Sequence, residues 1–405
     1  MKRGLEGLNK LLNPKTIAVV GASETPGKVG NVLMRKLEKS KCLVIPINPN
    51  RTEVLGKKSY SSVDKYPNKI GLVIIATPAP TVKSILEQCG KKKIKNVIII
   101  SAGFSEIGNQ KEEYQIIKTA GKFKINFLGP NCFGIANPFL DLDATFSNNS
   151  AKKGSIAFIS QSGALWSYIA DLDIKQGFSA FISLGNMAGL SFSDFIEYLN
   201  KDKKTKKIIL YIEKLKNGRE FINACKKSKK EIIVVKAGQT EAGSKAAISH
   251  TGSLATEYEV YKGIFRQANI KFVNSLAEAF NLKMPKIQIE KEIKTALIIT
   301  NAGGAGALLT DYIGKRGIKV KIIDLLGTAL AKDYKKTLDK KINKKYGKII
   351  VILTPQAMSH PEETSKIITK SKYKKKIITL FLGDKSVSHA IKILRKSGIK
   401  VYDRI

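Results

Sequence analysis

A glycine-rich loop around a histidine is the part of this 405-residue chain best suited to covalent chemistry. His250 lies within KAGQTEAGSKAAISHTGSLATE, residues 236–257, directly after an apolar run. An imidazole can accept a phosphoryl group and pass it on, and a nucleophile that visits two partners needs a mobile loop. The spacing by itself favours a loop histidine without a role, and we assign none to His360 or His389.

Two further strand ends carry groups that could serve a phosphorylated histidine. Gln161, Ser162 and Gly163 stand between an apolar run and a helix-like segment, where hydroxyl and N–H groups would face a phosphate. Their order differs from the G-x-S-x-G of a hydrolase nucleophile, which disfavours that class. Glu213 closes another apolar run. Its carboxylate could fix the tautomer of an imidazole, or it could be an exposed acid at a strand end.

A glycine turn near the N-terminus indicates a second phosphate-binding element. Gly21, Gly27 and Gly30 follow the apolar run 16–20 and precede a helix-like segment, so free N–H groups would face a phosphate. The spacing is not G-x-G-x-x-G, and the ribose-binding acid expected after the second strand is replaced by INPNR, residues 47–51. A tight turn without a ligand explains the same glycines. These features favour a phosphate-rich ligand other than NAD.

The elements that must position these groups are buried parallel strands. Apolar, β-branched runs alternate with helix-length segments, which is typical of βαβ units in sheets covered on both faces. The runs are residues 16–20, 42–47, 71–76, 96–101, 125–129, 155–160, 179–184, 207–213, 232–238, 295–300, 318–323, 348–353 and 376–382. So many units exceed one sheet. We therefore predict three α/β domains over residues 1–148, 149–288 and 289–405.

The charge is strongly positive but does not favour nucleic acid as the partner. The chain has 71 basic and 33 acidic residues, a net charge of +38. Only eight of the basic residues are arginines, and lysine lacks the bidentate fork with which proteins read base edges. The lysines also occur in short runs along the whole chain. We expect a lysine-rich surface whose positive field favours anionic ligands such as phosphates and CoA, and no nucleic-acid partner.

The remaining composition predicts a cytoplasmic protein with full cores. No stretch reaches the ~18 uninterrupted apolar residues of a membrane span, and the N-terminus lacks a signal-peptide core, so we expect no membrane partner. The four cysteines are scattered without a C-x-x-C pair, which predicts reduced thiols and no metal site. They are Cys42, Cys89, Cys132 and Cys225.

Taken together and in this order, the motifs resemble the α-subunit of ADP-forming (NDP-forming) acetyl-CoA synthetase, in the succinyl-CoA synthetase superfamily. The motifs are LNPKTIAVVGAS…PGKVG, INPN, ATPAP, SAGFSE, GPNCFG, SQSGAL, YIE, KAGQTEAGSKAAISHTGSLA and ILTPQAM…PEET. They cover nearly the whole chain. The resemblance implies a Rossmann-like CoA-binding domain followed by two flavodoxin-like domains, the last of them shortened.

The resemblance also implies roles for individual residues. His250 would become phosphorylated, Glu213 would orient and stabilise it, and the turn Gln161–Ser162–Gly163 would hold the phosphate. CoA would contact residues on the loops that follow the strands of the first domain: Ser23, Pro26, Gly27, Lys28, Pro49, Arg51, Thr77, Pro78, Ser101, Gly103 and Asn131.

The implied reaction interconverts acyl-CoA, phosphate and ADP with carboxylic acid, CoA and ATP through an acyl phosphate and a phosphohistidine. ADP, ATP and Mg²⁺ would bind mainly to an ATP-grasp domain, which the family carries on a separate β-subunit or as a C-terminal fusion. We expect an α₂β₂ complex. The alternatives are a non-catalytic CoA-binding regulatory protein of the same fold, an NAD-dependent oxidoreductase and, as a minor possibility, a nucleic-acid-binding protein.

Overall fold

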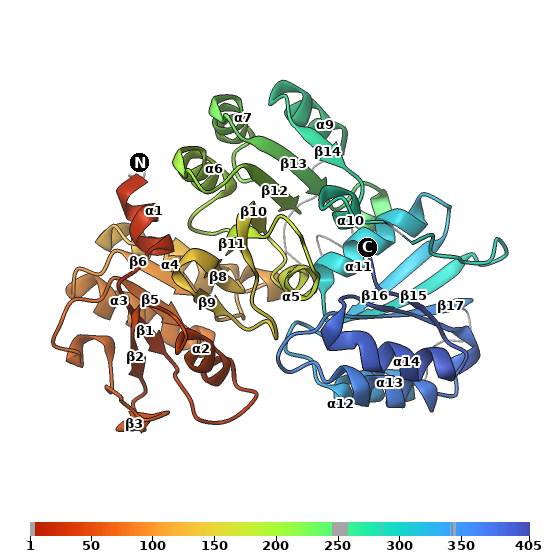
Figure 1. Cartoon of the computed structure of the whole chain (residues 1–405), viewed down its shortest axis with the longest axis horizontal. Helices are drawn as coiled ribbons and strands as arrows, with labels where there is room; N and C mark the ends of the chain where they lie inside the picture. Colours follow the sequence, from red (N-terminus) through yellow and green to blue (C-terminus); the bar gives the residue numbers. More distant parts are fainter. Residues whose placement is uncertain (1–4, 245–257, 284, 341, 343–345) are drawn as a thin grey trace.

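The computed structural model describes residues 5–244, 258–283, 285–340, 342 and 346–405. The chain forms three α/β units, each built around five parallel strands with helices on both faces; the sheet of the second unit also has two antiparallel strands. In Figure 1 the first unit (red to orange) and the third (cyan to blue) lie on either side of the second (yellow to green). The three predicted α/β units with buried parallel strands are therefore confirmed.

The first unit is a five-stranded parallel sheet in the order β2-β1-β5-β6-β7. Its strands are β1 (Thr16–Val20), β2 (Leu43–Ile47), β5 (Leu72–Ile75), β6 (Asn96–Ile99) and β7 (Asn126–Leu128), and its helices are α1 (Leu5–Leu12), α2 (Val29–Leu37), α3 (Ala79–Lys91) and α4 (Gln110–Phe123). A hairpin of β3 (Glu53–Val54) and β4 (Lys57–Lys58) projects beside it. Strands β5 and β6 are buried along their whole length because helices cover both faces of the sheet.

The second unit has seven strands in the order β14-β13-β12-β10-β11-β8-β9. They are β8 (Gly134–Asn137), β9 (Leu142–Thr145), β10 (Lys153–Ser160), β11 (Phe178–Ser183), β12 (Lys207–Ile212), β13 (Glu231–Lys236) and β14 (Lys271–Val273); the helices are α5 (Ala164–Asp171), α6 (Phe192–Lys201), α7 (Gly218–Lys227), α9 (Tyr258–Gln267) and α10 (Leu276–Ala279). The indole of Trp166 on α5 stacks on Phe181 of β11 with ring centroids 4.2 Å apart. This contact fixes α5 against the sheet.

The third unit is a five-stranded parallel sheet in the order β16-β15-β17-β18-β19. Its elements are β15 (Thr295–Thr300), β16 (Lys319–Asp324), β17 (Lys348–Leu353), β18 (Ile377–Phe381) and β19 (Lys400–Tyr402), with α11 (Gly303–Gly314), α12 (Ala331–Asp339), α13 (Pro361–Thr369) and α14 (Ser388–Lys396). Helix α11 contacts α5 of the second unit. The largest apolar cluster runs through all three units and includes Leu33, Phe158 and Ile298.

All three sheets share one strand order. If the parallel strands of each unit are numbered along the chain, their order across the sheet is 2-1-3-4-5. The strand order therefore reverses between strands 1 and 3, because strand 2 lies on one side of strand 1 and strands 3 to 5 lie on the other. In open α/β sheets, ligands bind at the carboxyl ends of the strands at this reversal. The fold therefore predicts sites after β1 and β5, after β10 and β12, and after β15 and β17.

Every apolar run predicted as a strand overlaps one, but within the described residues six further strands escaped prediction. These are β3, β4, β8, β9, β14 and β19, which have two to four residues each and carry no long apolar run. Strands β8 and β9 are also antiparallel to their neighbours, with Phe181 opposite Ala136.

The first predicted domain boundary differs from the sheet membership. Strands β8 and β9 precede residue 148 yet pair with β11, so they belong to the second sheet. The polar stretch 147–154 that suggested the boundary connects β9 to β10 within that sheet. By sheet membership the change of unit lies between β7 and β8. The predicted boundary at 288 lies between α10 and β15.

Substituting Gly30 tests the close approach of α2 to the first glycine turn. A Cβ at position 30 would overlap the carbonyl oxygen of Gly21, so we expect Gly30→Ala to lower the free energy of unfolding by about 1–3 kcal/mol. Gly121 lies in α4, and a Cβ added there would meet open space. We expect Gly121→Ala to raise the free energy of unfolding by about 0.5–1 kcal/mol. Urea unfolding followed by circular dichroism measures both, and equal midpoints for the two variants would contradict this packing.

Candidate active site

The carboxyl ends of strands from all three sheets surround one cavity of about 660 Å³. Thr77 follows β5, Gly163 follows β10 and Asn301 follows β15, and all three line it. The cavity therefore lies at the strand ends where the shared order predicts ligand binding. Its volume is in the range of a small-molecule site.

The side chain of Gln161 connects two of these strand ends. Its Oε1 accepts hydrogen bonds from the backbone N–H groups of Glu213 (2.7 Å) and Lys214 (2.9 Å), which joins the ends of β10 and β12. The residue is 3% exposed, and among the described residues its Nε2 finds no hydrogen-bond partner. A buried amide donor without a partner carries a desolvation cost that a ligand acceptor in the cavity would remove.

Two helices begin at the same wall of the cavity. Helix α5 starts after Gly163, and α11 starts at Gly303. A Cβ on Gly304 would lie 2.5 Å from Ser162 Oγ, so the two helix N-termini touch, and only glycine allows this approach. The Tyr211 hydroxyl donates to the Gly304 carbonyl at 3.1 Å and holds α11 in place. Free N–H groups and the positive ends of two helix dipoles suit this wall to an anion.

Glu213 follows β12 and lines the same cavity with 6% of its surface exposed. The interpretation as an exposed acid at a strand end is therefore wrong. Burial and, secondarily, the neighbouring Glu213 carboxylate raise the pKa of Tyr211 well above its usual value. The structure thus brings Glu213 and the Gln161–Ser162–Gly163 turn together, as the sequence predicted.

Four of the residues predicted to contact CoA line the cavity, and seven do not. Those in its wall are Thr77, Ser101, Gly103 and Asn131. Those outside its wall are Ser23, Pro26, Gly27, Lys28, Pro49, Arg51 and Pro78. The loops after β1 and β2 that carry most of this second group meet through the ion pair of Arg51 with Glu24 at 3.7 Å, and Val29, beside Lys28, reaches the cavity.

His250 lies outside the described residues, but the start of its loop is described. The Ala237 N–H donates to Ile212 at 3.0 Å. The next two contacts come from the third unit, because Asp311 on α11 accepts from the N–H groups of Gly238 (2.7 Å) and Thr240 (2.8 Å). The third unit therefore fixes the root of the segment that leads to His250.

Sequence reasoning missed the contribution of the third unit to the cavity. The residues of the third unit that line the cavity are Asn301, Ala302, Gly303, Asp324, Leu326, Gly327 and Thr328. The signal was present, because NAGGAG follows the run 295–300 as QSGAL follows the run 155–160. Leu326 adopts a left-handed backbone (φ 68°) and is 54% exposed, a combination of strain and exposure that is typical of functional loops.

The sequence did not reveal a cluster of amides and carboxylates in which Glu106, Asn131 and Asn186 line the cavity. The Asn186 Nδ2 donates to Glu106 (2.6 Å) and Glu113 (2.8 Å), and its Oδ1 accepts from Asn131 (3.2 Å). Asn186 belongs to the second unit, and the other three belong to the first. The cluster therefore holds the predicted residue Asn131 in one orientation and ties the two units together.

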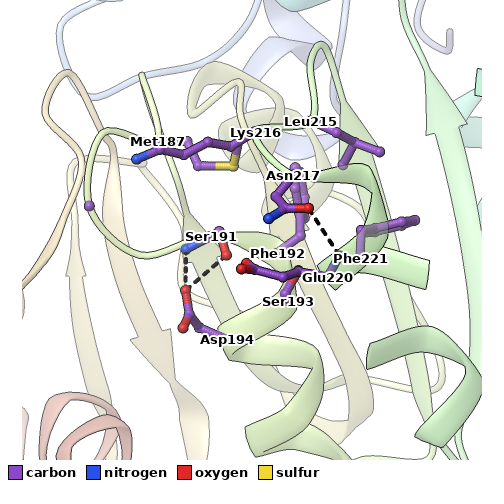
Figure 2. A pocket seen from close by; sticks show the side chains of 11 residues that line it. Met187, Ser191, Phe192, Ser193, Asp194, Leu215, Lys216, Asn217, Glu220 and Phe221 are labelled. Carbon is purple, nitrogen blue, oxygen red and sulfur yellow. Dashed lines mark hydrogen bonds between the residues drawn. The ribbon is translucent and has the colours of Figure 1, made fainter. Parts of the chain in front are cut away.

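A second, smaller hollow of about 200 Å³ opens between the N-termini of α6 and α7 (Figure 2). Ser191 donates its N–H and hydroxyl to Asp194, both at 2.8 Å, and Asn217 accepts from the N–H of Glu220 at 3.2 Å. Side chains of the helices themselves thus cap both helix starts. Among the described residues, no group of three or more His, Cys, Asp or Glu could hold a metal ion. No helix in the described part of the chain is long and apolar enough to span a membrane.

Comparison with known proteins agrees with this architecture. Residues 15–138 match the CoA binding domain family, and residues 153–284 match the family of the succinyl-CoA ligase like flavodoxin domain. The chain is 37% identical to the α-subunit of acetate–CoA ligase (ADP-forming) II of Pyrococcus furiosus, covering 98% of this chain and 94% of that subunit. It is 36% identical to acetate–CoA ligase (ADP-forming) I of Archaeoglobus fulgidus, covering 97% of this chain but 61% of that protein.

A solved structure extends the comparison. The dinucleotide forming acetyl-coenzyme A synthetase 1 of Ca. Korarchaeum cryptofilum, in complex with phosphate and ADP, is 32% identical with a TM-score of 0.65, over 98% of this chain and 93% of that one. A CoA-binding unit and a succinyl-CoA-ligase-like unit that share one cavity are the combination expected of an acid–thiol ligase. The chain belongs to the family of ADP-forming acetate–CoA ligase α-subunits.

Asp311 offers a direct test of the contact between the second and third units. Asp311→Asn replaces an acceptor oxygen by an NH₂ group that faces the backbone donors of Gly238 or Thr240. We expect it to lower the free energy of unfolding by about 1.5–3 kcal/mol. Asp339→Asn removes an exposed ion pair with Lys335 on α12. This control should change the free energy of unfolding by less than about 0.5 kcal/mol. The midpoints of urea unfolding compare the two variants. An Asp311→Asn midpoint equal to that of wild type would contradict the assigned contact.

Proposed function

We propose that this chain catalyses the acyl-transfer half of an ADP-forming acyl-CoA ligase reaction and receives a phosphoryl group on His250. The observation that carries the proposal is the part of the cavity wall where the unpaired NH₂ group of Gln161 and two helix N-termini meet beside the buried Glu213. The root of the His250 loop is fixed near this site by Asp311. The solved relative from Ca. Korarchaeum cryptofilum contains phosphate and ADP, which supports the same ligand class.

The first step would join phosphate to the acyl group. A phosphate oxygen attacks the thioester carbonyl, a C–O bond forms, the C–S bond breaks, and the electron pair leaves on the CoA sulfur. Negative charge builds up on the carbonyl oxygen and the sulfur while the phosphate stays anionic. The Gln161 NH₂ group and the N–H groups at the starts of α5 and α11 are fixed donors that would stabilise this charge.

The second step would move the phosphoryl group to the imidazole. A P–N bond forms at His250, the P–O bond to the acyl oxygen breaks, and the electron pair leaves on the carboxylate product. The imidazole gains positive charge in this step, and an ionised Glu213 would stabilise it and fix the tautomer. In the reverse direction, the same groups return the phosphoryl group to a carboxylate.

The CoA groove would run along the loops after the strands of the first unit. Thr77, Ser101, Gly103 and Asn131 would contact the part of CoA inside the cavity. The predicted contacts outside its wall, around Gly27 and Arg51, would hold the nucleotide end. A basic chain with a net charge of +38 suits a ligand that carries several phosphates.

Turnover would need a partner that supplies the nucleotide site. We propose an ATP-grasp β-subunit in an α₂β₂ complex, with ADP, ATP and Mg²⁺ bound mainly there, as the resemblance implies. The chain spans 94% of the α-subunit from Pyrococcus furiosus but 61% of the Archaeoglobus fulgidus protein, which agrees with a partner subunit. Four unpaired cysteines support a cytoplasmic location.

Replacing His250 tests whether the reaction passes through a phosphohistidine. We expect His250→Ala to abolish labelling by ³²P-phosphate plus acetyl-CoA and to abolish ATP formation with the partner subunit, because the acceptor nitrogen is lost. His389→Ala is the matched control and should keep both, since His389 is an exposed residue of α14 paired with Glu362. Full turnover in His250→Ala would contradict a reaction through phosphohistidine. A wild-type chain that binds CoA but shows neither label nor turnover would favour the alternative, a non-catalytic CoA-binding protein. Tight binding of NADH instead of CoA would favour an oxidoreductase.

Substituting Gln161 separates its two functions. Gln161→Glu keeps an oxygen for the N–H groups of Glu213 and Lys214 but replaces the cavity-facing NH₂ by a second oxygen, so we expect the KM for phosphate to rise about tenfold or more. Gln88→Glu on α3 makes the same chemical change away from the cavity and should leave this KM unchanged. Initial rates at varied phosphate measure the effect. An unaltered KM in Gln161→Glu would remove Gln161 from the phosphate site.

A further inference from the structure

Two phenylalanine rings form an apolar part of the cavity wall, and the steps proposed above leave them without a function. Phe133 and Phe146 both line the cavity, and they are 3% and 8% exposed. Their ring centroids lie 3.8 Å apart, with the ring planes tilted by 39°. Two large rings in contact present a continuous apolar surface. Such a surface in a small-molecule cavity favours an apolar part of the ligand.

The backbone on each side of this ring pair is anchored to a different unit. The N–H of Phe133 donates to the hydroxyl of Ser183, the last residue of β11, at 2.8 Å. The carbonyl of Phe146, which follows β9, accepts from the N–H of Ala357 in the third unit at 3.2 Å. The pair is therefore fixed from both sides, so it bounds the cavity instead of moving aside for a larger ligand.

Phe133 lies where the proposed function brings the reacting carbon. It stands two residues after Asn131, which that proposal assigns to CoA. A Cβ on Gly163 would overlap the Cβ of Phe133, so Phe133 touches the turn assigned to phosphate. In the acyl-transfer step the carbonyl carbon lies between the CoA sulfur and the attacking phosphate oxygen. The substituent on that carbon would therefore lie close to the ring pair.

The charged side chains of the wall agree with an uncharged acyl group. The chain has 71 basic residues, yet none of the described residues that line the cavity is Lys, Arg or His. The acids Glu106, Glu213 and Asp324 line it instead. A second carboxylate on the acyl group would find no cationic side chain among these residues, and the acids would repel it.

We propose that Phe146 is a specificity-determining residue, whose ring closes the space beside Phe133 and limits the substrate to short, uncharged acyl groups. This inference rests on the proposed function. Phe133 touches the Gly163 turn, whereas Phe146 contacts Phe133, so shortening Phe146 enlarges the cavity and keeps the side chain beside the turn. Rings that only hold the units together, or that contact only the pantetheine arm of CoA, predict equal changes for every acyl-CoA.

A comparison of acyl-CoA substrates tests the inference. The full chain is incubated with ³²P-phosphate and with acetyl-, phenylacetyl- or succinyl-CoA below saturation, and the initial rate of protein labelling is measured. Phe146→Ala removes the phenyl ring that phenylacetyl-CoA adds to acetyl-CoA, so we expect the ratio of the phenylacetyl-CoA rate to the acetyl-CoA rate to rise about tenfold or more. Succinyl-CoA should stay a poor substrate, because the acids of the wall are unchanged. Phe146→Leu covers the case that the alanine variant fails to fold, and it should raise the ratio about threefold.

Phe195→Ala and Phe195→Leu are the matched controls, because Phe195 on α6 is fully buried and lies outside the cavity wall. Both should keep the wild-type ratio. Three results would overturn the inference and leave the proposed function intact: a wild-type ratio in the Phe146 variants, an equal gain for succinyl-CoA, or a wild type that uses phenylacetyl-CoA at least as fast as acetyl-CoA. A wild-type chain that no acyl-CoA labels would instead overturn the proposed function, and this inference with it.

Discussion

The contact between the second and third units is the constraint on which the site depends, because each unit supplies part of the cavity wall. Two buried carboxylates make this contact in opposite directions. Asp311 of the third unit accepts backbone N–H groups of the second, and Asp171 of the second accepts those of Asp384 (2.7 Å) and Ser386 (3.2 Å) of the third. Hydrogen bonds to an ionised acceptor are roughly twice as strong as neutral ones, so each carboxylate fixes a loop of the neighbouring unit.

Helix α5 transmits this constraint to the cavity wall. Its N-terminus lies at the Ser162–Gly163 turn, and its last residue is Asp171. A Cβ on Gly383 would lie 2.5 Å from the Asp171 carboxylate, so glycine is needed where the third unit meets the end of the helix. Because a short helix is rigid, the third unit sets the position of the N–H groups that face the cavity.

The sequence predicted what depends on local patterns. Long apolar runs such as 207–213 identified the central strands, and the order of βαβ units identified the class of fold. The Gln161 turn was found because a strand, a Ser/Gly turn and a helix follow one another in the chain. Asp171 and Asp311 escaped prediction because their partners are 71 to 215 residues away and an isolated aspartate has no local signature.

The meeting of α5 with α11 explains why the fold favours an anion. Each helix N-terminus carries roughly half a positive charge, so two N-termini in contact repel each other. The carbonyl of Gly304 accepts a hydrogen bond from the Tyr211 hydroxyl. The Gln161 NH₂ group adds a donor that has no partner among the described residues. The arrangement thus concentrates donors and positive potential on a small part of the wall, beside the Glu213 carboxylate. A bound anion would remove both the repulsion and the unpaired donor, so ligand binding and the cohesion of the second and third units reinforce each other.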